Sequence, residues 1–116
     1  MNNTDNLILH VKNCLKNTEL LSSKLTNEIL EMYGMSGYKT RHLYNNLCNN
    51  SDIKLLEIGT FKGSTTCSLI YKNNILGFCV DDFSQFTNGE DNVKNIFLEN
   101  FNKFKGSNNI KFIAKD

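Results

Sequence analysis

The sequence predicts a single α/β domain built on a parallel sheet. Near residue 51 the hydrophobic pattern changes from helical spacing to short apolar runs, and helical segments separate three such runs. This alternation is typical of a doubly wound sheet with right-handed crossovers. A chain of 116 residues has the size of one domain. We therefore expect a helical segment at residues 1–50 that packs on the sheet, and a β-α-β-α-β half-domain at residues 51–116.

The first fifty residues are expected to be mainly helical. Two runs of apolar side chains at helical spacing predict two helices, and these runs are Leu7, Val11, Leu15 and then Leu21, Leu25, Ile29, Met32. Thr4 or Asp5 is the expected first N-cap, and the pattern breaks near Asn17-Thr18. Ser36, in the glycine-rich loop at 34–37, is a candidate cap for a third helix with an inward face of Leu43, Tyr44 and Leu47.

The second half alternates strands with helices. Strands are expected at residues 53–58, 75–80 and 110–114, because each run is short, apolar and followed by a polar residue or glycine. Such runs are typical of parallel strands that are buried on both faces. Helices are expected at residues 64–73 and about 91–104, and the second carries one apolar stripe formed by Val93, Phe97, Phe101 and Phe104.

The charge and the apolar segments disfavour two classes of partner. The net charge is +1 and the lysines are scattered, so the chain lacks the basic patch of a nucleic-acid binder. No stretch has the length of a membrane span, and the N-terminus lacks the basic segment and long apolar core of a secretion signal. We expect a cytoplasmic protein that binds neither nucleic acid nor membrane.

The cysteines and histidines predict no metal site. The four cysteines are widely spaced, without a C-x-x-C pair, and are expected to be small buried residues in a reducing compartment: Cys14, Cys48, Cys67 and Cys79. His10 and His42 are isolated, and a structural or solvated role is the common one for a lone histidine. No metal-ligand set built by the protein is therefore expected.

The stretch that indicates function begins where the first strand ends. Glu57 precedes Gly59 by two residues, and Gly63, Ser64 and Thr65 follow. A turn from a parallel strand into a helix presents free backbone N–H groups and suits an anionic or zwitterionic group. Gly59 permits the turn and keeps a Cβ away from a ligand, while Gly63 allows a close approach. The two hydroxyls can add hydrogen bonds, and Glu57 can accept from an ammonium or hydroxyl group.

The spacing of the glycines disfavours two well-known phosphate-binding motifs. A dinucleotide fingerprint, G-x-G-x-x-G, requires glycine at position 61, which is Phe61 here. A P-loop, G-x-x-x-x-G-K-[ST], requires four residues between its glycines and then a lysine. Only three residues separate Gly59 from Gly63, and Ser64 follows.

The remaining pattern, E-x-G-x-x-x-G-S within "LEIGTFKGST", resembles the class I S-adenosylmethionine-dependent methyltransferases, above all the small O-methyltransferases of the macrocin and catechol type. In that family the acid before the first glycine suits a cofactor that carries an ammonium group. The resemblance places Thr60 and Phe61 in the same cofactor site. It also implies that Asp81, at the end of the second strand, binds the ribose hydroxyls.

The resemblance covers about residues 34–116 and implies further contacts. Met35 and Ser36 match a loop that closes over the methionine part of the cofactor. Asp82 is expected to be a supporting acceptor or a contact near the adenine. Asp116 is a candidate near the adenine, and three aromatic residues are candidates for the wall around it: Phe61, Phe83 and Phe86. Lys62 is expected to be a solvated loop residue.

The resemblance also implies a fold and a reaction. The chain corresponds to the N-terminal, cofactor-binding half of a Rossmann-like sheet, with three strands in the order 3-2-1. The family's catalytic base or metal carboxylates lie on a fourth strand, so the catalytic residue is unknown, and His42 is the only base considered. We expect a truncated or fragmentary methyltransferase with a small-molecule or sugar acceptor, methylated at oxygen. The open edge of strand one is expected to be covered by a missing segment, by another copy or by a partner chain.

Several alternatives remain open at this point. Glu57 could be an ordinary acid at a strand end, and Asp81 and Asp82 could form a solvated turn or an N-cap. The chain could be a non-catalytic Rossmann-like module that pairs its sheet edge with a partner. It could also be a fragment of an NAD-type oxidoreductase, which the spacing of the glycines disfavours.

Overall fold

The computed structural model describes residues 2–84 and 92–115 and contains a three-stranded parallel sheet. The strands are β1 (Lys54–Ile58), β2 (Leu76–Val80) and β3 (Asn109–Ile113), in the order β1-β2-β3. Read from the opposite edge, this is the expected order 3-2-1. The α/β class and the positions of all three strands are therefore confirmed, to within one residue at each end.

The two ladders bring β1 and β3 into register on either side of β2. Phe78 pairs with Leu56 on one side and with Lys111 on the other. A Cβ on Gly77 would lie 2.0 Å from the carbonyl oxygen of Leu55. Only glycine therefore fits at this point of β2 without moving the neighbouring strand.

Two helices cover one face of the sheet, α4 (Ser64–Ile70) and α5 (Val93–Phe104). All four residues of the predicted apolar stripe of α5 are buried, which confirms that prediction. The ring of Phe97 lies at the centre of the core, 4.7 Å from the ring of Phe112 and 5.5 Å from that of Phe101. Ile70 and Cys79 belong to the same cluster and are fully buried.

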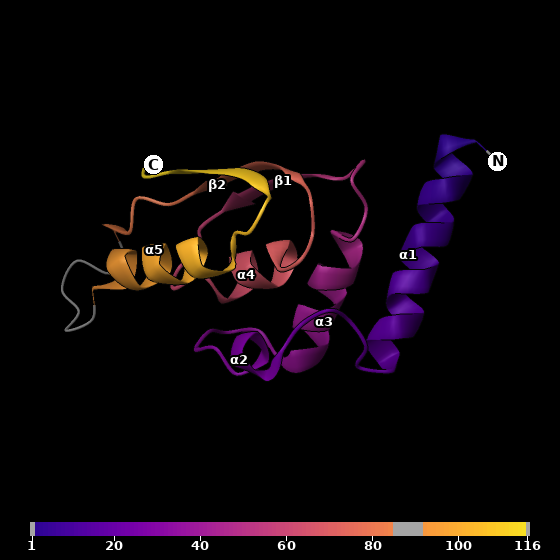
Figure 1. Cartoon of the computed structure of the whole chain (residues 1–116), viewed down its shortest axis with the longest axis horizontal. Helices are drawn as coiled ribbons and strands as arrows, with labels where there is room; N and C mark the ends of the chain where they lie inside the picture. Colours follow the sequence, from indigo (N-terminus) through magenta and orange to yellow (C-terminus); the bar gives the residue numbers. More distant parts are fainter. Residues whose placement is uncertain (1, 85–91, 116) are drawn as a thin grey trace.

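The opposite face of the sheet is bare among the described residues. Figure 1 shows the strands along one side of the molecule and the helices on the other. Leu56 and Ile58 in β1 are 65% and 80% exposed, and Phe78 in β2 is 45% exposed. The prediction that these strands are buried on both faces is therefore wrong for the described structure, because no described helix packs against the outward side chains.

The N-terminal segment forms α1 (Asn3–Glu19), α2 (Asn27–Leu30) and α3 (Tyr38–Leu47). Helix α1 packs on α3, and both α2 and α3 pack on α4, so this segment reaches the sheet mainly through α4. Figure 1 shows α1 at one end of the molecule. Its cap is Asn2, whose side chain accepts from the amide of Asp5, so the predicted caps lie inside the helix.

The inward faces of α1 and α3 are more polar than expected. Leu7, Val11 and Leu15 are exposed, and α1 buries Cys14 and Thr18 instead. The buried residues of α3 are Arg41, His42 and Asn45. The predicted residues Leu43, Tyr44 and Leu47 are only partly buried, and of these Tyr44 packs against the core. Hydrogen bonds explain this difference, because Asn45 Nδ2 donates to the carbonyls of Ser68 and Tyr71 in and after α4. Ser36 does not cap α3, whose N-cap is Gly37.

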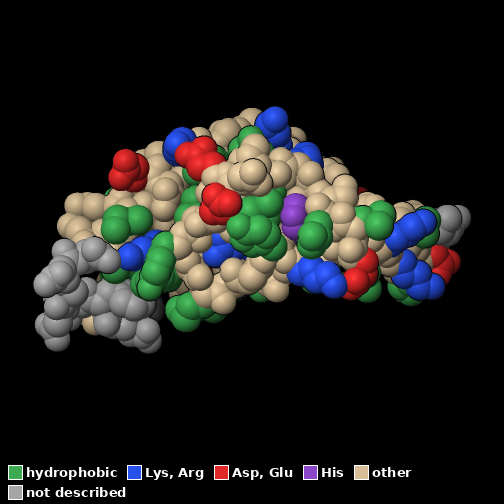
Figure 2. Space-filling view, turned by 90° about the horizontal axis from the view of Figure 1, so that it is seen from below, with side chains coloured by type: hydrophobic (Ala, Val, Ile, Leu, Met, Phe, Trp, Pro, Cys, Tyr) green, Lys and Arg blue, Asp and Glu red, His purple; other side chains and the backbone are tan. Residues whose placement is uncertain are grey.

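The surface on the side of α2 and α3 carries mixed charges. In Figure 2 basic side chains lie among acidic and hydrophobic ones on this face.

All four cysteines are free and buried, as expected. Within the part of the chain that the structure describes, no cluster of His, Cys, Asp and Glu could hold a metal ion, and no helix has the length and apolar character needed to cross a membrane.

Candidate functional site

A hollow of about 440 Å³ lies at the carboxyl end of β1, where the chain turns into α4. Two segments that are distant in sequence line the hollow. One is the linker before α3 together with the first turn of α3, and the other is the turn between β1 and α4 together with the start of α4. The lining residues are Met35, Ser36, Gly37, Thr40, Gly59, Thr60, Phe61, Ser64 and Thr65. Seven of these nine are among the residues that the sequence predicts as cofactor contacts.

Glycines give this hollow its shape. Gly59 has a φ of 86°, and a Cβ there would meet no atom within 4 Å, so the turn leaves open space beside it. Gly63 has a φ of 98°, and its Cβ would lie 3.1 Å from the ring of Phe97. A Cβ on Gly34 would lie 2.0 Å from Ser64 Oγ, so the linker before α3 rests directly on the start of α4. The open turn at Gly59 agrees with the prediction, whereas the close approach at Gly63 is to Phe97 of α5 and not to a strand.

Asp81 holds the turn between β1 and α4. Its Oδ2 accepts from the amides of Thr60 at 2.8 Å and Phe61 at 3.2 Å, and its Oδ1 accepts from the amide of Phe83 at 2.8 Å. Phe61 and Phe83 both have positive φ, 49° and 59°, which is rare for bulky residues and marks backbone strain. The amides of Thr60 and Phe61, which the sequence leaves free for a bound anion, are therefore already occupied.

Glu57 lies on the covered face of β1 and accepts a hydrogen bond from the hydroxyl of Thr66. Burial raises the pKa of Glu57 to about 7; the bond from Thr66 acts against this shift and the nearby charge of Asp81 adds to it. The thiols of Cys67 and Cys79 also lie near Glu57, and burial raises the pKa of each to about 12, so they stay neutral at pH 7. Among the described residues, no ion pair involves Glu57 or Asp81.

Neither acid lines the hollow itself. Asp81 is bonded to two residues that do, Thr60 and Phe61, and Glu57 is bonded to Thr66, the neighbour of the lining residue Thr65. Asp81 therefore contacts the turn, and Glu57 contacts the first turn of α4. This arrangement differs from the expectation that both acids face a bound ligand directly.

Other predicted residues have mixed outcomes. Asp82 is exposed and accepts from the amide of Ser84, and this bond holds its pKa below the usual range. It is thus a turn acid, as the alternative interpretation allowed. Phe83 is buried in the core and is no free wall for an adenine ring. Met35 is 90% exposed at the rim of the hollow. Phe86 and Asp116 lie outside the described residues.

Of two basic residues considered from the sequence, Lys62 differs from expectation and His42 does not. Lys62, expected to be solvated, is only partly exposed and its Nζ lies 4.5 Å from the centroid of the Tyr33 ring. His42 is buried and hydrogen-bonds through Nδ1 to Ser23 Oγ at 2.6 Å, and burial lowers its pKa. His42 does not line the hollow, so a structural role fits it better than that of a base.

The sequence does not identify four residues of the site, Gly37, Thr40, Arg41 and Thr66. Gly37 and Thr40 line the hollow, and Thr66 bonds to Glu57. Arg41 is only 2% exposed and donates from Nε to Ser36 Oγ at 3.0 Å. Proximity to the glycine-rich loop could have pointed to Gly37 and Thr40, but nothing in the sequence marks Arg41 as buried.

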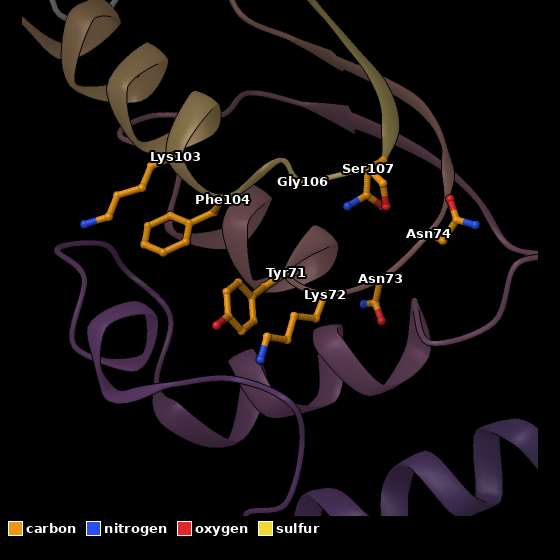
Figure 3. Close-up of a pocket in the computed structure, with 9 residues that line it drawn as sticks. Tyr71, Lys72, Asn73, Asn74, Lys103, Phe104, Gly106 and Ser107 are labelled. Carbon is orange, nitrogen blue, oxygen red and sulfur yellow. The ribbon is translucent and has the colours of Figure 1, made fainter.

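A second hollow, of about 420 Å³, lies at the other end of the strands (Figure 3). It lies near the ends of α4 and α5, and the rings of Tyr71 and Phe104 meet there edge to face, with centroids 5.9 Å apart. Lys72, Lys103 and several asparagines line the rest of it. None of the predicted site residues contributes to this hollow.

No family model, curated protein or solved structure matches the chain.

Proposed function

We propose that this chain is the S-adenosylmethionine-binding part of a methyltransferase that acts at oxygen on a small-molecule or sugar acceptor. The observation that carries the proposal is the composition of the hollow beside β1. Seven of its nine lining residues are those that the methyltransferase-like motif and its upstream loop predict. In Rossmann-like sheets, ligands bind beyond the carboxyl ends of the parallel strands, which is where this hollow lies.

The size and charge of the site fit this cofactor. A volume of about 440 Å³ lies within the usual range for small-molecule sites. The cofactor carries a sulfonium and an ammonium group, and Glu57 and Asp81 form no ion pair with any described cation. A cationic group near Glu57 would offset the burial that raises its pKa to about 7.

Each residue then has a definite binding role. Because Glu57 and Asp81 do not line the hollow as described, the proposal requires the ligand to extend past its lining residues. There Glu57 would accept from the ammonium group, and Asp81 Oδ1 keeps a lone pair for a ribose hydroxyl while Oδ2 holds the turn. Met35 and Ser36 would cover the methionine part. When bound, the cofactor supplies an electrophilic methyl group, and the protein mainly binds and orients the reactants. The proposal assigns no catalytic base to the described residues.

Calorimetry on the purified chain tests the proposal. We expect S-adenosylmethionine and S-adenosylhomocysteine to bind and NAD not to bind. Binding of NAD alone would overturn the proposal in favour of an oxidoreductase. Binding of none of the three would favour a module without a nucleoside site.

Substitution of Glu57 makes the test specific to the site. Glu57→Gln keeps the size of the side chain and can still accept from Thr66, but it removes the charge. Because charge-assisted hydrogen bonds are about twice as strong as neutral ones, we expect S-adenosylhomocysteine to bind about tenfold or more weakly at pH 8. Asp52→Asn is the matched control, since Asp52 is an exposed acid before β1. Equal affinity in the Gln variant and the wild type would count against the site.

The same titration at pH 6 adds a second readout. Glu57, with a pKa of about 7, is mostly protonated at pH 6, and an ammonium group beside it favours the ionised form. Binding should therefore release up to about one proton, seen as a heat that depends on the buffer. The Glu57→Gln variant should release none.

A second candidate function is a non-catalytic module that pairs the edge of its sheet with another chain. One observation favours it: β1 is an edge strand, and its Leu56 and Ile58 are exposed. Sedimentation over a range of concentrations tests it. Self-association without nucleoside binding would favour this candidate, and a monomer that binds S-adenosylhomocysteine would exclude it.

A further inference from the structure

The hollow at the amino ends of β2 and β3 is separate from the one beside β1. Residues 71–74 precede β2 and residues 106–108 precede β3, and both segments line this hollow of about 420 Å³. Its volume lies within the usual range for small-molecule sites. Because it lies at the other end of the strands, an occupant of this hollow cannot react with a cofactor bound beside β1.

Two aromatic rings form one side of the hollow. The rings of Tyr71 and Phe104 meet there edge to face, and Figure 3 shows them on one side, with Asn73 and Ser107 on the other. Tyr71 is only partly buried, so part of its ring is free to contact a ligand. A planar ring suits this surface, because aromatic pairs favour offset and edge-to-face contacts.

The charge of the lining is positive. Two lysines and no described acid line the hollow. Lys103 pairs with Glu28, whereas Lys72 forms no ion pair with the described residues. The Nζ of Lys72 lies 5.6 Å from the centroid of the Tyr71 ring, so the cation and the ring are neighbours. An anionic group on a ring that packs against Tyr71 would therefore lie close to Lys72.

A second cation adds to this positive charge. Lys24 does not line the hollow, but its Nζ donates to the carbonyl of Lys72 at 2.8 Å. Burial lowers the pKa of Lys24, and the charge of Lys72 lowers it further. No ion pair within the described part of the chain involves either lysine. A bound anion would offset the repulsion between the two ammonium groups.

The side of the hollow opposite the rings contains an acceptor without a donor. Asn73 is 5% exposed, and its Nδ2 donates to the carbonyls of Asn45 at 3.0 Å and Leu69 at 2.8 Å. These bonds fix which end of the amide is the oxygen. Among the described residues, Asn73 Oδ1 is the only buried side-chain polar atom without a hydrogen-bond partner. Buried acceptors are nearly always satisfied, so this atom calls for a donor from outside the described chain.

We propose that this hollow binds a small planar aromatic anion that carries a hydroxyl group, such as a hydroxybenzoate. The ring packs against Tyr71, the anionic group pairs with Lys72, and the hydroxyl donates to Asn73 Oδ1 after a small shift of that side chain. A hydroxyl fits better than an ammonium group, because this oxygen is itself buried and only a small donor can reach it. The inference depends on this hollow alone and not on the proposed function.

NMR titrations of the purified chain with three related compounds test the site. The compound para-hydroxybenzoate has all three groups, benzoate lacks the hydroxyl, and para-hydroxybenzyl alcohol lacks the charge. We expect para-hydroxybenzoate to bind with a dissociation constant of about 1 mM, and each of the other two to bind about threefold or more weakly. The amide signals of residues 71–74 and 106–108 should shift, and those of Gly59 and Thr60 should not.

The variant Lys72→Gln tests the charge separately. We expect it to bind para-hydroxybenzoate about threefold to fivefold more weakly and to bind the neutral alcohol with unchanged affinity. Lys72 is exposed, and Lys24 bonds to its carbonyl and not to its side chain, so the variant keeps that bond. Lys12→Gln is the matched control, because Lys12 is an exposed lysine of α1, and it should change neither affinity.

Four outcomes would overturn the proposal. The first is no binding of para-hydroxybenzoate at about 10 mM, and the second is a set of shifts centred on the turn after β1. The third is equal affinity for benzoate and para-hydroxybenzoate, because Asn73 Oδ1 would then accept from no ligand. The fourth is an equal loss of the charged and the neutral compound in Lys72→Gln. Titration with S-adenosylhomocysteine tests the proposed function separately, and its failure would leave these outcomes unchanged.

Discussion

The two faces of the sheet have similar apolar composition but opposite surroundings. On the covered face, Cys79 and Ile110 are buried against α4 and α5. On the bare face, Leu56, Ile58 and Phe78 are 65%, 80% and 45% exposed, so none of them is buried. Successive residues of one strand point to opposite faces of the sheet. Phe78 is therefore exposed, whereas its neighbour in sequence, Cys79, is buried.

This difference shows that apolar character in a strand predicts the strand but not the burial of each residue. Hydrophobic stabilisation follows the apolar area removed from water, so the covered face supplies it and the bare face adds little. The rings of Phe97, Phe101 and Phe112 concentrate that burial on one side. Substitutions on the two faces should therefore differ strongly in their effect on the free energy of unfolding.

The largest effect is expected for Phe97→Ala, on the covered side. Phe97 is fully buried among aromatic rings, and its truncation leaves a cavity. We expect a loss of about 3–5 kcal/mol in the free energy of unfolding, measured by urea denaturation. If this variant does not fold, Phe97→Leu provides the measurement with a smaller loss, about 1–2 kcal/mol. A loss below about 1 kcal/mol for Phe97→Ala would contradict the assignment of the core to this face.

The fold could be predicted where a local pattern determines it. The strands were located because apolar runs end at glycine or polar residues, and the stripe of α5 because phenylalanines recur at helical spacing. The inner face of α3 could not be predicted, since Arg41, His42 and Asn45 are buried through hydrogen bonds to distant residues. The bare face could not be predicted either, because coverage depends on where other elements pack.

The second largest effect concerns Glu57, the acid on the covered face. Its pKa rises from the usual 4.5 to about 7 in the folded protein, so the fold favours the protonated form. The contribution of Glu57 to stability should be largest below pH 4.5 and should be lost as the pH rises to 7, because the unfolded chain releases this proton first. The pKa difference corresponds to about 3 kcal/mol. At pH 8, Glu57→Gln should therefore raise the free energy of unfolding by about 2–3 kcal/mol.

Urea denaturation from pH 4 to pH 8 measures this contribution. The two proteins should have nearly equal stability at pH 4, where Glu57 is neutral in both states, and the variant should lack the decline between pH 4.5 and pH 7. Equal stability at pH 8 would mean that the Glu57 carboxylate is well solvated. The partial burial of Glu57 on the covered face would then not raise its pKa.

The candidate site could be predicted in composition but not in its internal bonds. The spacing of Glu57, Gly59 and Gly63 identified the turn, because glycines and a carboxylate at a strand end serve few other purposes. The bonds from Asp81 to the amides of Thr60 and Phe61 were not predicted, since they depend on how β2 ends beside β1. Arg41 was missed for a similar reason: its burial follows from tertiary packing and not from its neighbours in sequence.

The smallest effect is expected on the bare face, for Phe78→Thr. Threonine has the β-branched shape that strands favour, and the ring it replaces is 45% exposed and lies on the face that no described helix covers. We expect the free energy of unfolding to change by no more than about 1 kcal/mol in urea denaturation. The ratio between this loss and that for Phe97→Ala measures the difference between the two faces.

A large loss in the free energy of unfolding for Phe78→Thr would contradict the distinction between the covered and the bare face. A cost close to that for Phe97→Ala would mean that the ring of Phe78 is removed from water in solution. Measurement at two protein concentrations then identifies the cause. If the loss grows with concentration, copies of the chain cover the face, because association adds to apparent stability by mass action. If the loss is independent of concentration, the chain itself shields Phe78, and the division into covered and bare faces is wrong.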